Sequence, residues 1–334
     1  MTRPDAAPTG RPTLAQVAAR AGVSLKTASR ALGGESYVSE KTLAVVLEAA
    51  RELDYQRNSA ASLLASGRLA DSIGLITGDF TNPFYSALAQ GIEDEIRTHG
   101  MHLSVTNSRE SAEQERRVAH DLADRQTKAV VTVSAMPDHE EYAALQARGI
   151  PVVFVDRPAD DLDADSVVFD NREGGRLAAR HLIDAGHTRI AFIGDFAWLP
   201  TFRERMAGMG DVLDDVSPRW RDLLRTDAHD VESSRARVHE LLGLEHPPTA
   251  IVAGNNRILL GVMEALTAIP AAERPAVLGF DDPEWAQVLG ITVVTGDVEE
   301  LGRSAARLAV ARLGDRGRPF ENVVLPMRLI VRGA

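Results

Sequence analysis

TLAQVAARAGVSLKTASRAL, residues 13–32, has the pattern of two short helices joined by a tight turn. Thr13 and Gln16 form a capping-box pair. Apolar residues then recur at helical spacing, which predicts a first helix from Leu14 to Ala21. Gly22 supplies the permissive backbone that a sharp turn needs. The stretch therefore predicts a helix-turn-helix unit near the start of the chain.

The second helix of this unit, with Ser24 as its N-cap, presents two different faces. Its inward face is small and apolar, as close helix packing requires. In a helix-turn-helix unit the second helix lies in the major groove, where Lys and Arg pair with guanine and apolar groups contact thymine methyls. An ordinary helical hairpin is the alternative on these residues alone. The expected base-reading residues, on the outward face, are Leu25, Lys26, Ser29 and Arg30.

A third helix is predicted from Lys41 to Leu53, capped by Ser39. Asn58 is a plausible N-cap for one more helix, Ser59 to Ala65. A helix this short is not stable alone, so a partner must order it. The apolar residues expected to complete the three-helix core are Leu43, Val46, Leu47 and Ala50.

Further along the chain, short sequence motifs follow one another in a fixed order and make the interpretation of the helix-turn-helix unit more specific. Together they resemble the LacI/GalR family of bacterial transcriptional regulators, in the family's order from Thr13 to Gly333. Besides residues 13–32, they are VSEKT, LDYQRNSAASLLASGR, IGLI, NPFY, GIE, FVDR, DNREGG, GHTRIAFIG, RERMAGM, LGFDD and LPMRLIVRG.

This resemblance implies an all-α helix-turn-helix head joined to an α/β core of two doubly wound parallel-sheet lobes, similar to periplasmic sugar-binding proteins. The expected domains are a DNA-binding head at 1–56, a hinge helix and linker at 57–70, and an effector-binding and dimerisation core at 71–334.

The resemblance also implies contacts of the head and hinge with DNA. Leu64 is the expected wedge that enters the minor groove and kinks the duplex; a buried linker residue is the alternative. Ser62 and Ala65 stand where basic residues are frequent, which should weaken phosphate attraction there. The residues expected to contact the DNA backbone are Thr13, Ser24, Thr27, Tyr37 and Asn58.

Charge is divided unevenly along the chain, whose formal net charge is −11. Residues 1–68 hold nine Lys/Arg against six Asp/Glu, a balance of +3, which leaves −14 for the remainder. A basic head on an acidic body is typical of a site-specific DNA binder. There is no apolar run long enough for a membrane span, and residues 1–10 lack the apolar segment of a signal peptide. We therefore expect a cytoplasmic protein that does not bind membranes.

From Asp71 onward, short apolar runs alternate with amphipathic segments such as Pro83–Thr98 and Ser111–Arg125. This alternation is typical of βαβ units and a parallel sheet. The predicted strands are Ile73–Thr77, Leu103–Thr106, Ala129–Val133, Val152–Val155, Val167–Phe169, Ile190–Ile193, Ala250–Ala253, Ala276–Gly279 and Ile291–Val294.

Some 260 residues exceed a comfortable single core, so two lobes are expected. In the family the chain crosses between the lobes three times, here near Phe169, Thr295 and Met327. Helix Glu299–Leu313 would then return to the first lobe. The implied lobes are about 71–168 with 296–326, and about 169–295 with 327–334.

Ligands of parallel sheets bind beyond the carboxyl ends of the strands, which face each other across the cleft of a two-lobed protein. Polar residues at strand ends are therefore candidates. They are the loop Asp79–Tyr85, the pair Asp156 and Arg157, and the pair Asp170 and Asn171. A plain helix start explains Asn82 and Pro83 equally well, and a surface ion pair is the alternative for each charged pair.

The resemblance adds an arginine for a sugar hydroxyl or carboxylate, Arg205, whose fork suits paired hydrogen bonds, and a hydroxyl-binding aspartate, Asp281. Trp285 would stack on a sugar face or fill the core. The full expected effector set is Asn82, Phe84, Asp156, Arg157, Asn171, Arg205, Asn255, Asp281 and Trp285.

Three departures from the family pattern affect the expected pocket. Asn256 stands where an aspartate is usual, Gly296 where a glutamine is common, and the segment from Leu266 to Pro275 is short. A regulator with an altered or lost effector pocket is therefore the alternative interpretation.

The sequence as a whole predicts a homodimeric, effector-responsive repressor that binds operator DNA and a small, sugar-like molecule. A solute-binding protein is a remote alternative, because the head would have no role in it. Zero cysteines exclude thiolate metal sites and a Cys nucleophile. The nine histidines form no zinc or triad motif and no dinucleotide glycine motif occurs, so we expect no catalytic residue, metal or cofactor.

Overall fold

The computed structural model describes residues 12–33, 38–55 and 71–332. The chain forms two compact units, Met1–Leu69 and Ala70–Ala334, and each is described here by itself. The predicted helix Ser59–Ala65, together with Tyr37, Asn58 and Leu64, lies outside the described residues.

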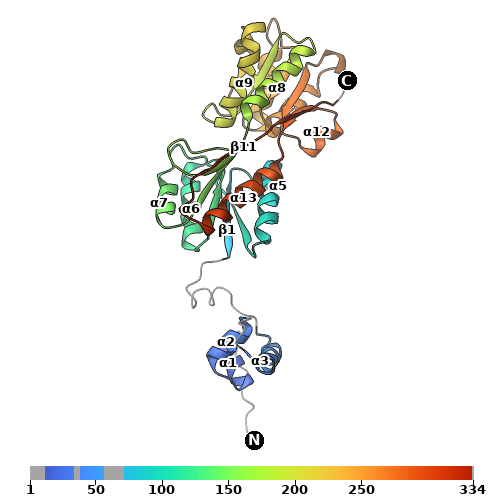
Figure 1. Cartoon of the computed structure of the whole chain (residues 1–334). Helices are drawn as coiled ribbons and strands as arrows, with labels where there is room; N and C mark the ends of the chain where they lie inside the picture. Colours follow the sequence, from blue (N-terminus) through green and yellow to red (C-terminus); the bar gives the residue numbers. More distant parts are fainter. Residues whose placement is uncertain (1–11, 34–37, 56–70, 333–334) are drawn as a thin grey trace. The chain divides into compact units, whose positions relative to one another are not determined.

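The first unit contains the predicted helix-turn-helix, α1 (Leu14–Ala21) and α2 (Leu25–Leu32), followed by α3 (Glu40–Glu52) (Figure 1). Both halves of the capping box at Thr13 form, and Gly22 adopts φ 66°, as a sharp left-handed turn requires. The prediction that Leu47 belongs to the three-helix core is wrong, because Leu47 is 50% exposed. The side chains fully buried between the three helices are Val17, Ala28 and Val46.

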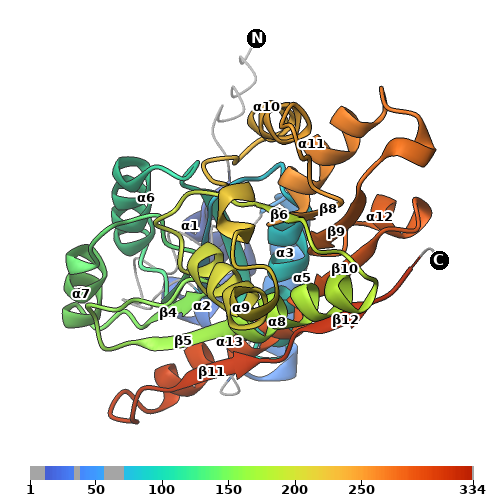
Figure 2. The ribbon, with the colours of Figure 1, turned by 90° about the horizontal axis from the view of Figure 1, so that it is seen from above.

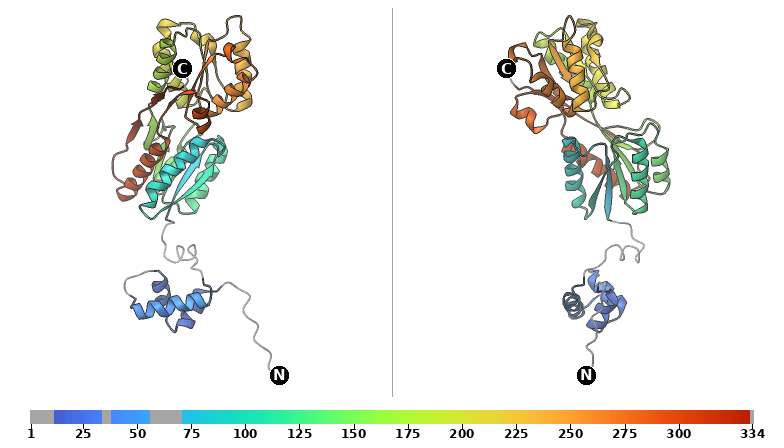
Figure 3. Two further views of the ribbon diagram at one scale, coloured as in Figure 1. Left: turned by 90° about the vertical axis from the view of Figure 1, so that its right-hand side faces the viewer. Right: turned by 180° about the vertical axis from the view of Figure 1, so that it is seen from behind.

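The second unit consists of two halves, which we call lobe one and lobe two. Lobe one is built on a parallel six-stranded sheet with the order β11-β5-β4-β3-β1-β2. Helices α5 and α13 cover one face of this sheet, and α6 and α7 cover the other (Figure 3). The bounds are β1 (Ser72–Thr77), α5 (Pro83–Arg97), β2 (His102–Asn107), α6 (Ala112–Asp124), β3 (Ala129–Thr132), α7 (Glu140–Ala147), β4 (Val152–Val155), β5 (Asp165–Phe169), α13 (Val298–Gly314) and β11 (Asn322–Leu325).

Lobe two repeats this plan on a sheet with the order β12-β10-β9-β8-β6-β7, in which only β12 runs antiparallel to its neighbour. Helices α8 and α9 cover one face, and α10, α11 and α12 cover the other. The bounds are α8 (Asn171–Asp184), β6 (Ile190–Ile193), α9 (Pro200–Val216), β7 (Leu224–Arg225), α10 (Val231–Leu242), β8 (Ala250–Ala253), α11 (Asn256–Leu266), β9 (Ala276–Phe280), α12 (Glu284–Val288), β10 (Thr292–Thr295) and β12 (Arg328–Ile330), with 3-10 turns at Trp220–Leu223 and Ala271–Glu273.

Glycines bring two helices into backbone contact in each lobe. A Cβ at Gly91 of α5 would lie 2.0 Å from the carbonyl oxygen of Glu299 in lobe one. A Cβ at Gly208 of α9 would lie 1.9 Å from the carbonyl oxygen of Arg172 in lobe two. Only glycine allows such an approach. The two lobes therefore share a helix crossing as well as a strand order.

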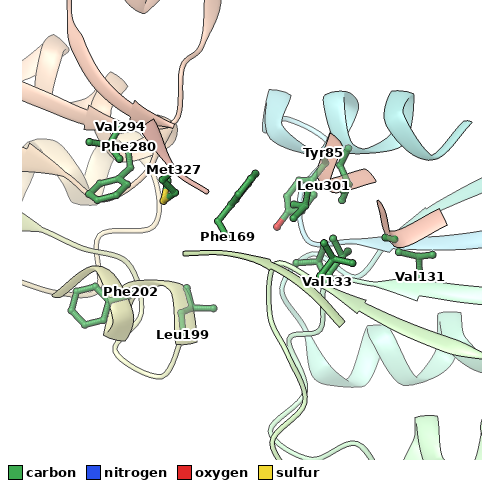
Figure 4. Packing of buried hydrophobic residues seen from close by; sticks show 14 of the residues in the cluster. Tyr85, Val131, Val133, Phe169, Leu199, Phe202, Phe280, Val294, Leu301 and Met327 are labelled. Carbon is green, nitrogen blue, oxygen red and sulfur yellow. The ribbon is translucent and has the colours of Figure 1, made fainter. Parts of the chain in front are cut away.

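The chain passes between the lobes three times, after β5, after β10 and between β11 and β12. In Figure 2, β11 and β12 lie end to end along one side of the two sheets. Phe169, at the end of β5, lies between buried side chains of both lobes, with Phe280 and Met327 on one side and Tyr85 and Leu301 on the other (Figure 4). These crossings bring the carboxyl ends of the two sheets together.

Candidate functional site

A cavity of about 460 Å³ lies at the carboxyl ends of the strands of both lobes. Its wall follows β1, β2 and β4 of lobe one and β6, β8 and β9 of lobe two, as expected for parallel sheets. The lining residues are Gly78, Asp79, Asn82, Phe84, Tyr85, Asn107, Arg109, Glu110, Asp156, Arg157, Asp195, Phe196, Leu199, Thr201, Phe202, Arg205, His229, Asp230, Gly254, Asn255, Arg257 and Asp281.

Most of the expected effector residues meet in this cavity, and two do not. Asn171 is 5% exposed, accepts a hydrogen bond from Arg205 and donates one to the Phe169 carbonyl, so it supports the wall from behind. Trp285 is partly buried and packs against the apolar cluster of lobe two. The expected residues that line the cavity are Asn82, Phe84, Asp156, Arg157, Arg205, Asn255 and Asp281.

Asp156 and Asp281 occupy equivalent places, directly after β4 and β9. Both have φ 67°, and their amides donate to Val167 and Val294 of the adjacent strand. Burial raises the pKa of Asp156 to about 6, against the opposing charges of nearby guanidinium groups. Burial also raises the pKa of Asp281, whose carboxylate accepts one hydrogen bond, from the Asn256 amide. The two carboxylates thus have acceptor capacity left for a ligand.

Arg205 of α9 is 7% exposed and is fixed by protein groups on two sides. Its Nε donates to Asn171 (2.7 Å) and its Nη1 to the Gly254 carbonyl (2.6 Å), while its guanidinium lies 4.5 Å from the ring centroid of Phe280. These contacts leave Nη2 for a ligand in the cavity. Arg205 is therefore a rigid donor whose charge acts on the carboxylates of both Asp156 and Asp281.

Arg157 forms an ion pair that the sequence reasoning did not find. Its Nη1 and Nη2 donate to the two carboxylate oxygens of Glu110, at 2.6 and 2.9 Å, and Nη1 also donates to the Ser134 carbonyl. Glu110 belongs to the loop between β2 and α6, where Arg109 and Glu110 both have positive φ. A loop conformation of this kind leaves no periodic signal in a sequence.

One side-chain hydrogen bond joins the lobes directly across the cavity wall. Asn256 Nδ2 donates to Asn82 Oδ1 (2.8 Å), which also accepts from the Phe84 amide (2.9 Å) as the N-cap of α5. The amide at residue 256 makes this bond possible, because an aspartate would present an acceptor to an acceptor.

Gly296, which stands where the family commonly has a glutamine, also has a structural explanation. A Cβ at Gly296 would lie 2.1 Å from the ring of Phe169, so this ring occupies the space that a glutamine side chain would need. Phe169 does not line the cavity.

An aromatic strip borders the lobe-two side of the cavity. The ring of Phe196 stacks on His229 (4.6 Å between centroids) and on Trp198 (6.1 Å), and Arg157 lies 5.7 Å from the Trp198 ring. Phe196 and His229 line the cavity, whereas Trp198 is 45% exposed beyond it. In the sequence, Phe196 and Trp198 belong to the run FAW soon after β6. Aromatic rings of this kind suit the apolar face of a ligand.

The helix-turn-helix presents its own candidate surface on α2. Leu25, Lys26 and Arg30 are exposed and Ser29 is half-buried, on the face opposite the buried Ala28. The hydroxyls of Thr13 and Ser24 accept hydrogen bonds from the backbone amides of Gln16 and Thr27 at the helix starts. The α2 face thus carries two cations and no carboxylate toward solvent.

In the part of the chain that the structure describes, every helix is too short or too polar to cross a membrane. The same described residues contain no group of three or more His, Cys, Asp or Glu side chains placed to hold a metal ion.

Comparison with known proteins matches both units of the chain. The family model described as bacterial regulatory proteins, lacI family, matches residues 13–58, and the periplasmic binding protein domain matches residues 73–316. The ribose operon repressor of Bacillus subtilis is 29% identical over 96% of this chain and 97% of its own. The regulator GalR of Escherichia coli K12 is 28% identical over 94% of this chain and 93% of its own.

Solved structures match over the same extent. The lac repressor dimer bound to operator and the anti-inducer ONPF has a TM-score of 0.82 at 25% identity, over 97% of this chain and 98% of that one. The complex of the transcriptional regulator CelR with cellobiose has a TM-score of 0.71 at 29% identity, over 96% of this chain and 99% of that one.

Proposed function

Because the chain belongs to the LacI family of bacterial regulatory proteins, we propose that it is a transcriptional repressor whose affinity for operator DNA is controlled by a small, uncharged polar ligand held between its lobes. Residues 1–56 form the DNA-binding head in this proposal, 57–70 the hinge and 71–334 the regulatory core. The protein acts in the cytoplasm, as a homodimer.

The exposed face of α2 supports the DNA-binding half of the proposal. Lys26 and Arg30 suit guanine edges and Leu25 suits a thymine methyl, while the helix start at Ser24 faces the sugar-phosphate backbone. Two heads related by a two-fold axis would bind two half-sites of opposite orientation. The lac repressor dimer bound to operator is an arrangement of this type.

The chemistry of the cavity supports the ligand-binding half. Hydroxyl groups both donate and accept hydrogen bonds, and the wall offers Arg205 as a donor beside Asp156 and Asp281 as acceptors. The apolar face of a sugar ring would fit the rings of Phe84 and Phe196. Relatives named for ribose, and a structure with cellobiose, point to the same class of ligand.

The observation that carries the proposal is the presence of both devices in one chain, a reading helix in one unit and a ligand-sized cavity between two lobes in the other. A ligand that binds one arrangement of the lobes more tightly shifts the equilibrium of the whole dimer, and operator affinity changes with it.

The test is a two-step experiment on the full chain. Thermal unfolding in the presence of single sugars and nucleosides identifies ligands, since a compound that binds the folded state raises its midpoint. DNA fragments selected by the protein from a random pool should share a pseudo-palindrome. A pool without a common site would contradict the proposed DNA-binding function, and a screen without any stabilising sugar or nucleoside would favour the altered-pocket alternative.

A further inference from the structure

The cavity wall carries more acidic than basic side chains. They comprise six carboxylates and four guanidinium groups, so the wall is net negative when His229 is neutral. The carboxylates are Asp79, Glu110, Asp156, Asp195, Asp230 and Asp281, and the guanidinium groups are Arg109, Arg157, Arg205 and Arg257.

Arg157 is the group that would bind an anion best, and it is already occupied. It is 8% exposed, and its two terminal nitrogens form a bidentate pair with Glu110, the geometry in which arginine holds a carboxylate or a phosphate. A ligand anion would therefore have to displace the protein's own carboxylate.

The chain holds Glu110 firmly in this place. Tyr85 donates its hydroxyl to Glu110 Oε1 (3.2 Å), and the left-handed backbone of Arg109 and Glu110 directs the loop over the cavity. A Cβ at residue 78 would lie 1.9 Å from Glu110 Oε1, so Gly78 provides the room for the carboxylate. Three separate features thus serve one ion pair.

The other buried guanidinium does not replace Arg157 as an anion site. Arg205 donates through Nε to Asn171 and through Nη1 to the Gly254 carbonyl, so each of its two bidentate edges, Nε with Nη2 and Nη1 with Nη2, has one nitrogen engaged within the protein. Its charge acts on the carboxylates of Asp156 and Asp281, which would face any anion placed beside it.

We propose that Glu110 is a specificity-determining residue: by occupying the fork of Arg157, it restricts the cavity to uncharged polyhydroxylated ligands and excludes phosphorylated or carboxylated ones. This inference rests on the proposed function in taking the cavity as the effector site. Removal of Glu110 exposes a buried cation and creates an anion site.

The experiment compares thermal unfolding of the full chain in inorganic phosphate and in chloride at equal ionic strength. Glu110→Ala should gain a saturable rise in midpoint, half-complete at about tenfold less phosphate than any rise in the unchanged protein. Arg157→Met in the same background should abolish the gain. Glu113→Ala, which removes a carboxylate of an exposed pair with Arg117 on α6, is the matched control and should behave as the unchanged protein. If Glu110→Ala does not fold, Glu110→Ser, whose short side chain also leaves the fork of Arg157 empty, takes its place with the same expectation.

Three results would overturn the inference: a saturable phosphate effect of equal size in the unchanged protein, no gain in a folded Glu110 variant, or a gain that survives Arg157→Met. Stabilisation of the unchanged protein by ribose 5-phosphate but not by ribose would overturn it as well. Failure of the proposed function is a separate outcome, in which no sugar alters operator binding although the phosphate results stand.

Discussion

Asp156 and Asp281 show how a backbone conformation places a ligand group. Both adopt the left-handed region, which few residues other than glycine, asparagine and aspartate enter readily. Each aspartate follows the end of a central parallel strand, where its amide adds one more hydrogen bond to the adjacent strand. Its carboxylate then lies beside the cavity. Each lobe thus supplies one acceptor by the same device.

The raised pKa of Asp156 predicts a pH dependence of stability. Its pKa rises from 3.8 to about 6 because burial disfavours the ionised form, so the folded state holds a proton that the unfolded state has lost between these values. The contribution of Asp156 to the free energy of unfolding should therefore fall as pH rises from 3.8 to about 6 and then level off. Asp156→Asn should lack this component. The measurement is the urea midpoint of both proteins from pH 4 to 7; parallel curves would refute the prediction.

Arg30 belongs to the exposed face of α2, and its loss should affect specific binding selectively. Arg30→Ala should cost about 1–3 kcal/mol at the selected operator and little on random DNA, because a base-edge contact exists only at the right sequence. Gel-shift titrations on both DNAs measure the two affinities. Equal losses would mean that Arg30 contacts only phosphate.

The positions of strand ends in the sequence located part of the cavity wall, including Asn82, Asp156 and Asn255, because the carboxyl ends of parallel strands converge where the lobes face each other. They could not locate Glu110, whose position depends on two left-handed loop residues and on the space at Gly78. The same reasoning included Trp285 in the expected effector set. An aromatic residue near a strand end gives the same sequence pattern whether it faces a ligand or the core.

The central strands were predictable from the sequence, and so was the edge strand His102–Asn107, predicted as Leu103–Thr106, but the other three edge strands were not. Val152–Val155 and Ile190–Ile193 match the predicted strands, because strands buried on both faces are continuous apolar runs. Leu224–Arg225, Asn322–Leu325 and Arg328–Ile330 lie at sheet edges and are short and partly exposed, so each contains at most three consecutive apolar residues.

The crossing of α5 and α13 depends on glycine. A Cβ at Gly302 would lie 2.3 Å from the Leu88 carbonyl oxygen, and backbone cannot yield as a side-chain end does. Gly302→Ala should therefore destabilise the protein by about 1–3 kcal/mol. Gly314→Ala on the same helix, where a Cβ meets nothing within 4 Å, is the control. Denaturant unfolding compares the two, and equal effects would contradict the close crossing.

At the scale of the whole core, the Asn82–Asn256 bond joins residues 174 positions apart and couples the lobes. A double-mutant cycle with Asn82→Ala and Asn256→Ala should give a coupling of about 1 kcal/mol in the free energy of unfolding. The cycle separates this bond from the cap that Asn82 also provides to α5. Strictly additive costs would show that the bond contributes nothing to the arrangement of the lobes.

Two α/β lobes follow from chain length and strand alternation, and the fold prediction is confirmed. Contacts between lobes, such as Asn82 with Asn256 and Phe169 beside Gly296, arise only when distant segments meet. The sequence marked Asn256 and Gly296 as departures from a family pattern, and their partners became apparent only in the folded chain.

Control of DNA binding through the cavity is tested most directly by an operator-binding titration of the full chain, with and without the ligand found by the thermal screen. The ligand should change the operator affinity of the unchanged protein by about 5- to 150-fold. Arg205→Ala should bind operator as well as the unchanged protein but show no such change, because the fixed donor of the cavity is gone. A ligand that stabilises the protein without altering operator affinity, or a full response in Arg205→Ala, would contradict control of DNA binding through this cavity.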